Sequence, residues 1–214
     1  MNIVNLEIEK YCLEKSSCPS SECESLENFT KNNILESEML IGKLEASFLG
    51  FLIQSISAKR ILEIGTFTGY SALAMAENLP NDGELITIEL EEKNLELAKT
   101  FWEKSLHGKK IKPKLGKALT VLPFINGTFD LIFIDADKSN YLEYLKISLE
   151  KLNENGVIIV DNVLWSGRVI ESANINDQNT LAIKQLNDFV ATNSFLYGTL
   201  LPIRDGLFLI KKSK

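Results

Sequence analysis

Apolar residues recur at spacings of three and four along the first part of the chain, and this period predicts helices across residues 1–55. The period is clearest between Leu40 and Ile53. Pro19 and the serines around it indicate a loop from Ser16 to Ser25. We therefore expect a helical N-terminal segment, residues 1–55, that packs on the core of a single domain spanning residues 1–214.

From residue 60 the pattern changes to short apolar runs, which are typical of strands buried in a parallel sheet. They predict strands over residues 60–65, 84–89, 111–115, 129–135 and 156–161, followed by a terminal hairpin over 195–201 and 207–211. The stretches between them predict helices over 70–79, 91–106, 141–152 and 180–191. Strands that alternate with helices indicate an α/β fold, in which helices cover both faces of a mostly parallel sheet.

Polar residues stand at the ends of four of these apolar strands. In open α/β sheets, ligands bind beyond the carboxyl ends of the strands. A carboxylate at the end of a buried strand is costly unless something pairs with it. One such residue could simply cap the next helix, but four at one sheet edge indicate a binding site. The residues are Glu63 with Gly65, Glu89, Asp135 with Asp137 and Lys138, and Asp161 with Asn162.

A glycine-containing turn follows the first predicted strand and leads into a helix. Gly65 and Gly69 allow a tight turn and let a ligand approach the backbone, although the full GxGxxG spacing is absent. Glu89 lies 20 residues beyond Gly69, at the end of the next strand, where a carboxylate suits hydrogen bonding to a ribose diol. The turn and the carboxylate together predict a cofactor that contains adenosine.

A second set of polar residues suits a hard metal ion. Asp135, Asp161 and Asn162 offer two carboxylates and an amide oxygen, which Mg²⁺ prefers. Zinc is disfavoured because His107 is the only histidine. Taken alone, Asp161 and Asn162 could be an ordinary turn after a strand. Lys138 is either a solvated surface lysine or a general base whose pKa a nearby divalent ion lowers.

Composition narrows the class of partner. The 214 residues include 29 acidic and 23 basic side chains, so the net charge is −6 and no net positive field attracts nucleic acid. The apolar stretch from Ala46 to Ile53 is far shorter than the roughly 20 residues that a membrane span needs. Residues 1–15 contain no uninterrupted apolar segment, so we expect a cytoplasmic protein. The irregular gaps between the three cysteines predict free thiols.

Together, these segments resemble the class I S-adenosylmethionine-dependent methyltransferases. The resemblance is strongest to the cation-dependent O-methyltransferases of the caffeoyl-CoA and catechol O-methyltransferase group, and it covers residues 38–212. The matching text is LEIGTFTGYS (62–71), TIE (87–89), FIDADKSNY (133–141) and DNVLW (161–165). The resemblance implies a Rossmann-like methyltransferase fold with extra N-terminal helices and a seven-stranded, mostly parallel sheet whose terminal strand is antiparallel. It also implies a homodimer.

The resemblance implies S-adenosylmethionine as the cofactor and a role for each residue around it. Glu89 would hold the ribose hydroxyls, and Ala118 would contact the adenine. The remaining residues would surround the methionine part and the sulfonium end, or lie against the cofactor from the fourth strand: Met39, Ile41, Glu63, Gly65, Thr66, Phe67, Ser71, Asp135 and Asp137.

The resemblance likewise implies a divalent cation, Mg²⁺ or alternatively Mn²⁺ or Ca²⁺. Its ligands would be Asp135, Asp161 and Asn162. Lys138 would be the catalytic base beside the catalytic Asp135. The acceptor would be bordered by Trp165 and Ser166.

The implied reaction is methyl transfer from S-adenosylmethionine to a hydroxyl of a catechol-like small molecule, assisted by the metal. Two other functions stay open on the residues alone. An NAD-type oxidoreductase would share the ribose-binding carboxylate, and a non-catalytic S-adenosylmethionine-binding protein would share the fold. Thr199 stands where the animal catechol enzymes have a glutamate that orients the hydroxyl, so that contact is absent here.

Overall fold

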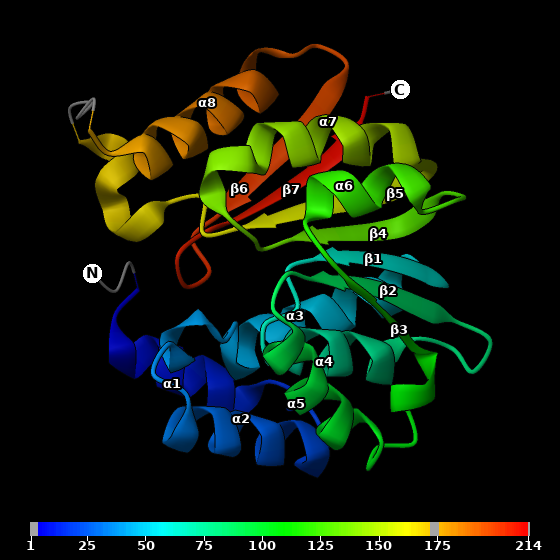
Figure 1. Cartoon of the computed structure of the whole chain (residues 1–214). Helices are drawn as coiled ribbons and strands as arrows, with labels where there is room; N and C mark the ends of the chain where they lie inside the picture. Colours follow the sequence, from blue (N-terminus) through cyan, green and yellow to red (C-terminus); the bar gives the residue numbers. More distant parts are fainter. Residues whose placement is uncertain (1–3, 172–175, 214) are drawn as a thin grey trace. The chain divides into compact units, whose positions relative to one another are not determined.

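The computed structural model describes residues 4–171 and 176–213. Their helices and strands are labelled in Figure 1, and the seven strands follow the order β3-β2-β1-β4-β5-β7-β6 in the sheet. The chain divides into two compact units, which we call the N-terminal unit (residues 7–126) and the C-terminal unit (residues 1–6 and 127–214). The predicted α/β fold with a seven-stranded sheet is confirmed, whereas the single domain stays a prediction.

The N-terminal unit contains a parallel set of strands with helices packed on it. Its strands are β1 (Arg60–Ile64), β2 (Glu84–Glu89) and β3 (Ile111–Leu115), and β2 pairs with both of the others in parallel. Helices α4 and α5 pack on β2 and β3, and helices α2 and α3 pack on α4. The helices are α1 (Leu6–Lys15), α2 (Ser21–Asn33), α3 (Gly42–Ser55), α4 (Tyr70–Asn78), α5 (Glu92–Trp102) and the short α6 (Ala118–Val121).

Helix α4 is the buried centre of this unit. Every residue from Tyr70 to Ala76 is buried, and α3 packs against this helix. The end of α4 is held by Lys110, whose Nζ donates hydrogen bonds to the carbonyls of Ala76 (3.0 Å) and Leu79 (2.7 Å). The Leu79 N–H reaches the Ala76 carbonyl at 3.4 Å, so the buried Lys110 amine completes the hydrogen bonding of this helix end.

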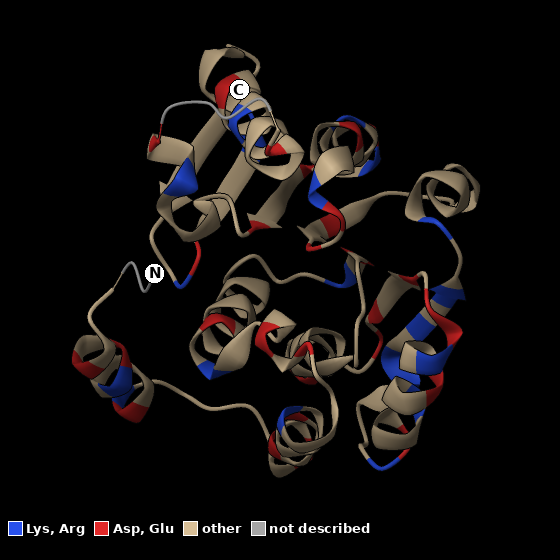
Figure 2. Ribbon diagram, turned by 60° about the vertical axis from the view of Figure 1, so that its left-hand side comes forward, with Lys and Arg blue, Asp and Glu red and all other residues tan. Residues whose placement is uncertain are grey.

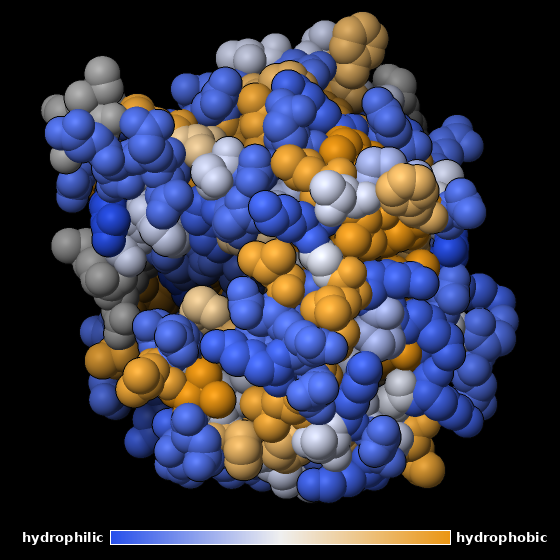
Figure 3. Space-filling view, viewed as in Figure 1, coloured by the Kyte–Doolittle hydropathy of each residue, from blue (hydrophilic) through white to orange (hydrophobic). Residues whose placement is uncertain are grey.

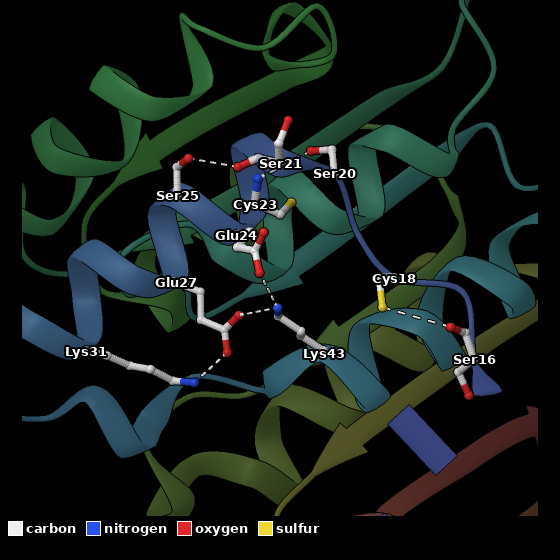
Figure 4. A network of polar contacts seen from close by, with 10 residues as sticks. All are labelled: Ser16, Cys18, Ser20, Ser21, Cys23, Glu24, Ser25, Glu27, Lys31 and Lys43. Atoms are coloured by element: carbon white, nitrogen blue, oxygen red, sulfur yellow. Dashed lines mark hydrogen bonds and ion pairs between the residues drawn. The ribbon is translucent and has the colours of Figure 1, made fainter. Parts of the chain in front are cut away.

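Polar contacts join α2 to α3. Figure 4 shows the Lys43 ammonium beside Glu24 (2.6 Å) and Glu27 (3.8 Å), and the Lys31 ammonium on the other side of Glu27 (2.6 Å). The Glu27 residue is 4% exposed, so the two lysines stabilise a carboxylate that would otherwise be costly to bury.

The C-terminal unit contains both parallel and antiparallel strands. β4 (Phe129–Ile134) pairs with β5 (Leu152–Asp161) in parallel, and β7 (Leu207–Lys212) pairs antiparallel with β5 and with β6 (Leu196–Leu201). The predicted terminal hairpin and the antiparallel last strand are therefore confirmed. Helix α7 (Tyr141–Lys151) packs on β4 and β5, and α8 (Gln178–Thr192) packs on α7 and β6.

Several boundaries differ from the sequence prediction, and α5 ends at Trp102 rather than at Leu106. Helix α2 begins inside the predicted loop, because the Ser20 side chain caps it by accepting a hydrogen bond from the Cys23 N–H (3.3 Å). Strand β5 begins at Leu152 rather than at Gly156, because Leu152 already pairs with Phe129 before a register shift. The start of α2 depends on a local cap, and the start of β5 depends on a pairing between distant residues.

The surface is mixed in charge and hydropathy. Acidic and basic residues are interspersed on the helices drawn in Figure 2, and apolar side chains lie scattered among polar ones on the face shown in Figure 3. Within residues 4–171 and 176–213, every helix is too short or too polar to span a membrane.

Candidate active site

The glycine turn after β1 depends on backbone angles that favour glycine. Gly65 and Gly69 have φ angles of 102° and 85°, and Phe67 between them has a φ of 50°. The Trp102 indole N–H donates a hydrogen bond to the Gly69 carbonyl (3.0 Å). A Cβ atom on Gly69 would lie 2.6 Å from the Trp102 ring. The turn therefore needs glycine at this position, and α5 holds it in place.

A buried chain of hydroxyl groups lies beneath this turn. The Glu63 carboxylate is fully buried and accepts hydrogen bonds from Ser71 Oγ and Thr87 Oγ1, each at 2.5 Å. Thr66 Oγ1 lies 2.5 Å from Thr87 Oγ1. Because Thr87 uses its one proton on Glu63, Thr66 must donate to Thr87. Glu63, Thr66 and Ser71, all predicted at the cofactor, thus form one network that holds the turn.

Glu89 links the turn to the start of α5. Its Oε2 accepts the Phe67 N–H (2.7 Å), and its Oε1 accepts the Glu91 N–H (2.9 Å). The residue is 7% exposed and ends β2. Oε1 also accepts the Asn94 Nδ2 amide at 3.4 Å, whereas Oε2 can accept a further hydrogen bond. This positioned carboxylate beside a glycine turn fits the ribose diol of an adenosine-containing cofactor.

Three other predicted cofactor residues also lie in the N-terminal unit. Met39 is 51% exposed in a short 3-10 helix, and Ile41 is 3% exposed just before α3. Ala118 begins α6 shortly after Gly116, whose φ is 138°. No contact in the structure tests a role for these residues toward a cofactor, so their roles stay predictions.

In the C-terminal unit, two of the three predicted metal ligands contact the ammonium group of Lys138. The Lys138 Nζ donates hydrogen bonds to Asp135 Oδ1 (3.1 Å) and to Asn162 Oδ1 (2.7 Å). Asp135 directly follows β4, and Asp161 and Asn162 end and follow β5. The neighbouring parallel strands thus bring together side chains that lie far apart in sequence.

The charges in this cluster favour a bound cation. Asp161 is 2% exposed. Burial is the main cause that raises the pKa of its carboxyl group, and the negative charge of Asp135 raises it further. Two carboxylates and an amide oxygen are donors of the kind that a hard divalent ion prefers, so the chemistry of the residues present fits Mg²⁺. Among the described residues, no group of three or more His, Cys, Asp or Glu side chains could hold a metal, so the amide of Asn162 is an essential part of this set.

Lys138 has a third partner that the sequence reasoning did not assign. The Tyr141 hydroxyl accepts a hydrogen bond from Nζ (2.5 Å), and its ring centroid lies 4.7 Å from Nζ. Burial raises the pKa of the Tyr141 hydroxyl, and the charges of Asp135 and Asp161 raise it further. The group therefore stays a neutral phenol. Tyr141 was visible in the matching motif, but its contact depends on the side-chain conformation.

The predicted acceptor residues lie in a strained turn after β5. Trp165 and Ser166 have φ angles of 47° and 54°, and the Ser166 N–H donates a hydrogen bond to Asp205 Oδ1 (2.5 Å). The Lys138 ammonium lies 5.8 Å from the Trp165 ring, and the Arg168 guanidinium lies 5.5 Å from it. Trp165 is therefore close to Lys138, the predicted base. The role of Asp205 was missed, because no local pattern points to a contact 39 residues away.

Asp137 is turned toward the start of α7. Its carboxylate accepts hydrogen bonds from Tyr144 Oη (2.5 Å), Asn140 Nδ2 (2.5 Å) and Ser139 Oγ (3.2 Å). These contacts hold the segment that contains Lys138. The predicted contact of Asp137 with the cofactor stays a prediction.

The sequence is similar to that of known O-methyltransferases along most of its length. A family model described as O-methyltransferase matches residues 13–213. The chain is 35% identical to a probable caffeoyl-CoA O-methyltransferase 2 from Dictyostelium discoideum, over 97% of this chain and 92% of that protein.

Solved structures show the same similarity. The SAH-bound methyltransferase PaMTH1 from Podospora anserina has a TM-score of 0.89 and 28% identity, with 97% of this chain and 94% of that chain covered. The O-methyltransferase TomG from Streptomyces achromogenes, in complex with SAM, has a TM-score of 0.89 and 26% identity, with 97% and 96% covered. The sequence and fold thus agree along almost the whole chain. The chain therefore belongs to the O-methyltransferase family, which confirms its resemblance to the class I S-adenosylmethionine-dependent O-methyltransferases of the caffeoyl-CoA group.

Proposed function

We propose that this protein transfers a methyl group from S-adenosylmethionine to a hydroxyl of a catechol-like small molecule with the help of a divalent metal ion. The observation that carries the proposal is that one oxygen of Asp135 and one of Asn162 both accept a hydrogen bond from the Lys138 ammonium. The buried Asp161 carboxylate directly precedes Asn162 in the chain. Family membership supports methyl transfer to oxygen. The donor set supports the metal and, with it, an acceptor that has two neighbouring oxygens.

Asp135, Asp161 and Asn162 would hold the ion. When bound, such an ion lowers the pKa of an acceptor hydroxyl and orients two adjacent oxygens. Lys138 is the residue that takes the hydroxyl proton at Nζ, which must be neutral when it does so. A positioned base of this kind contributes about 10²–10⁴ in rate. Trp165 and Ser166 border the aromatic acceptor.

The N-terminal unit provides the binding site for the methyl donor. Glu89 accepts the ribose diol, for which Oε2 keeps a free lone pair and Oε1 exchanges its 3.4 Å contact with Asn94. The network under the turn holds the backbone near the methionine part of the donor. In the transfer, the acceptor oxygen forms a bond to the methyl carbon while the bond from that carbon to sulfur breaks. Correct alignment of the two groups lowers the entropic part of the barrier.

The alternatives make different predictions for binding. An NAD-type oxidoreductase would bind a nicotinamide dinucleotide in calorimetry and not S-adenosylmethionine. A non-catalytic binding protein would bind S-adenosylmethionine and methylate no acceptor. The buried carboxylate, the amide oxygen and the lysine at one site favour the enzyme, because unused buried charges would be costly to keep.

A matched pair of acceptors tests the proposal. The name of the Dictyostelium relative makes caffeoyl-CoA, a catechol thioester, the first acceptor to test. The matched monophenol is coumaroyl-CoA, which lacks the second hydroxyl. With S-adenosylmethionine and Mg²⁺, mass spectrometry should show one added methyl group on the catechol and none on the monophenol. Equal methylation of both would contradict the metal-bound diol. No methylation of any catechol in a wider panel would contradict the proposed acceptor class.

A further inference from the structure

Lys138 is placed so that its charge opposes the ion that the proposed function requires. We propose that the Lys138 ammonium competes with the divalent ion for the oxygens of Asp135 and Asn162, and so sets the metal affinity of the site. This inference rests on the proposed function, because it concerns the same metal site. It assigns the lysine a second role that is separate from proton removal.

The contacts of Lys138 account for its full hydrogen-bonding capacity. An ammonium group has three N–H donors. In the structure these reach Asp135 Oδ1, Asn162 Oδ1 and Tyr141 Oη at 3.1, 2.7 and 2.5 Å. The Lys138 side chain is 11% exposed, so water has little access to replace a lost partner. The ammonium is therefore held on two of the metal ligands.

A divalent ion on the same oxygens would stand close to this ammonium. Mg²⁺ binds oxygen at about 2.0–2.1 Å, which would place it roughly 4 Å from Nζ if the lysine did not move. Even with the dielectric constant of water, charges of +1 and +2 at about 4 Å repel enough to weaken binding about 30-fold. Metal binding thus requires Nζ to give up the contacts with Asp135 and Asn162.

Two groups can keep the displaced ammonium nearby. The neutral Tyr141 hydroxyl is not part of the metal donor set, and the Trp165 ring centroid lies 5.8 Å from Nζ. A lysine that pivots on Tyr141 away from the ligand oxygens stays within the site. Tyr141 therefore keeps the lysine in the site when the metal takes its other partners.

Direct metal binding tests the proposal without measuring activity. Mn²⁺ is titrated into the full-length protein at neutral pH, and free Mn²⁺ is followed by electron paramagnetic resonance. Lys138→Met, which removes the charge, should tighten Mn²⁺ binding about ten- to a hundredfold. Lys138→Arg keeps the charge and should bind as weakly as the wild type. Circular dichroism checks that each variant is folded.

A second variant separates direct competition from a general change of charge. Arg204 is a second cation whose charge acts on Asp161. Arg204→Gln removes one positive charge but leaves the contacts of Nζ intact, so it should tighten binding less than about threefold. If Lys138→Met and Arg204→Gln tighten binding equally, or Lys138→Met does not tighten it, the competition is refuted while the metal site stands. If neither the wild type nor any variant binds Mn²⁺, the metal part of the proposed function fails as well.

Discussion

Replacing Glu89 by Gln tests the cofactor half of the site, because this single carboxylate serves two purposes. Its oxygens accept the backbone N–H groups of Phe67 and Glu91 at 2.7 and 2.9 Å, and we propose that they also accept the ribose hydroxyls. Glutamine has one acceptor oxygen and one amide donor. Whichever way the amide turns, one of the two backbone N–H groups then faces another donor.

The structure sets the size of the expected effect. A hydrogen bond to a charged group contributes about 1.5–3 kcal/mol, so the loss of one such bond toward ribose weakens cofactor binding about 10- to 150-fold. An unsatisfied N–H at the turn further lowers the free energy of unfolding by about 1–3 kcal/mol. Isothermal titration of S-adenosylhomocysteine measures the first effect, and urea unfolding measures the second.

A neighbouring glutamate provides the control. Glu91 is exposed and contacts Glu89 only through its backbone N–H. Glu91→Gln removes the same charge and should change the Kd for S-adenosylhomocysteine less than about twofold, since exposed charges are strongly screened. If the Glu89→Gln variant binds S-adenosylhomocysteine with the wild-type Kd, the assignment of Glu89 to ribose is refuted. If its free energy of unfolding is unchanged, the role of Glu89 in holding the turn is refuted.

Further changes test other parts of the account. Gly69→Ala should lower the free energy of unfolding by at least about 2 kcal/mol, because the φ of 85° and the adjacent indole leave no room for Cβ; urea unfolding measures this, and wild-type stability would contradict it. Lys110→Met should cost about 2 kcal/mol, or about 4–8 °C in Tm, because two buried carbonyls at the end of α4 lose their donor. Burial lowers the pKa of Lys110 in the folded protein below 10.5, so between that lowered pKa and pH 10.5 the unfolded chain binds more protons than the folded one. The wild type should therefore gain stability relative to Lys110→Met as the pH rises toward 10.5. A stability difference that does not change with pH would contradict this. Asp161→Asn should reduce methyl transfer by about a hundredfold or more at a Mg²⁺ concentration that saturates the wild type, and full activity would remove Asp161 from the metal ligands.

The sequence allowed much of the site to be predicted, because strand ends and turns follow local rules. Glu89 was found from its distance to Gly69, and Asp135 and Asn162 from their positions after two parallel strands. Contacts that depend on side-chain conformation were not predictable. The Phe67 N–H reaches Glu89 because the φ of Phe67 is 50°, and no pattern specifies that angle.

Long-range loop contacts were also beyond prediction. Asp205 accepts the Ser166 N–H from a loop that carries no motif of its own. The start of α2 at Ser21 was missed, because Pro19 and the nearby serines are typical of loops as well as of helix caps. The first case depends on a contact between distant segments, and the second on a local signal that is typical of two structures.

Dependence of methyl transfer on a divalent ion tests the central claim most directly. The purified protein is treated with EDTA and gel-filtered, and transfer of a tritium-labelled methyl group from S-adenosylmethionine to a catechol acceptor is then measured as Mg²⁺ is added back. We expect the rate to fall to background in EDTA and to return in a saturable way with Mg²⁺. Full activity in excess EDTA would show that Asp135, Asp161 and Asn162 hold no catalytic ion, and it would contradict the account.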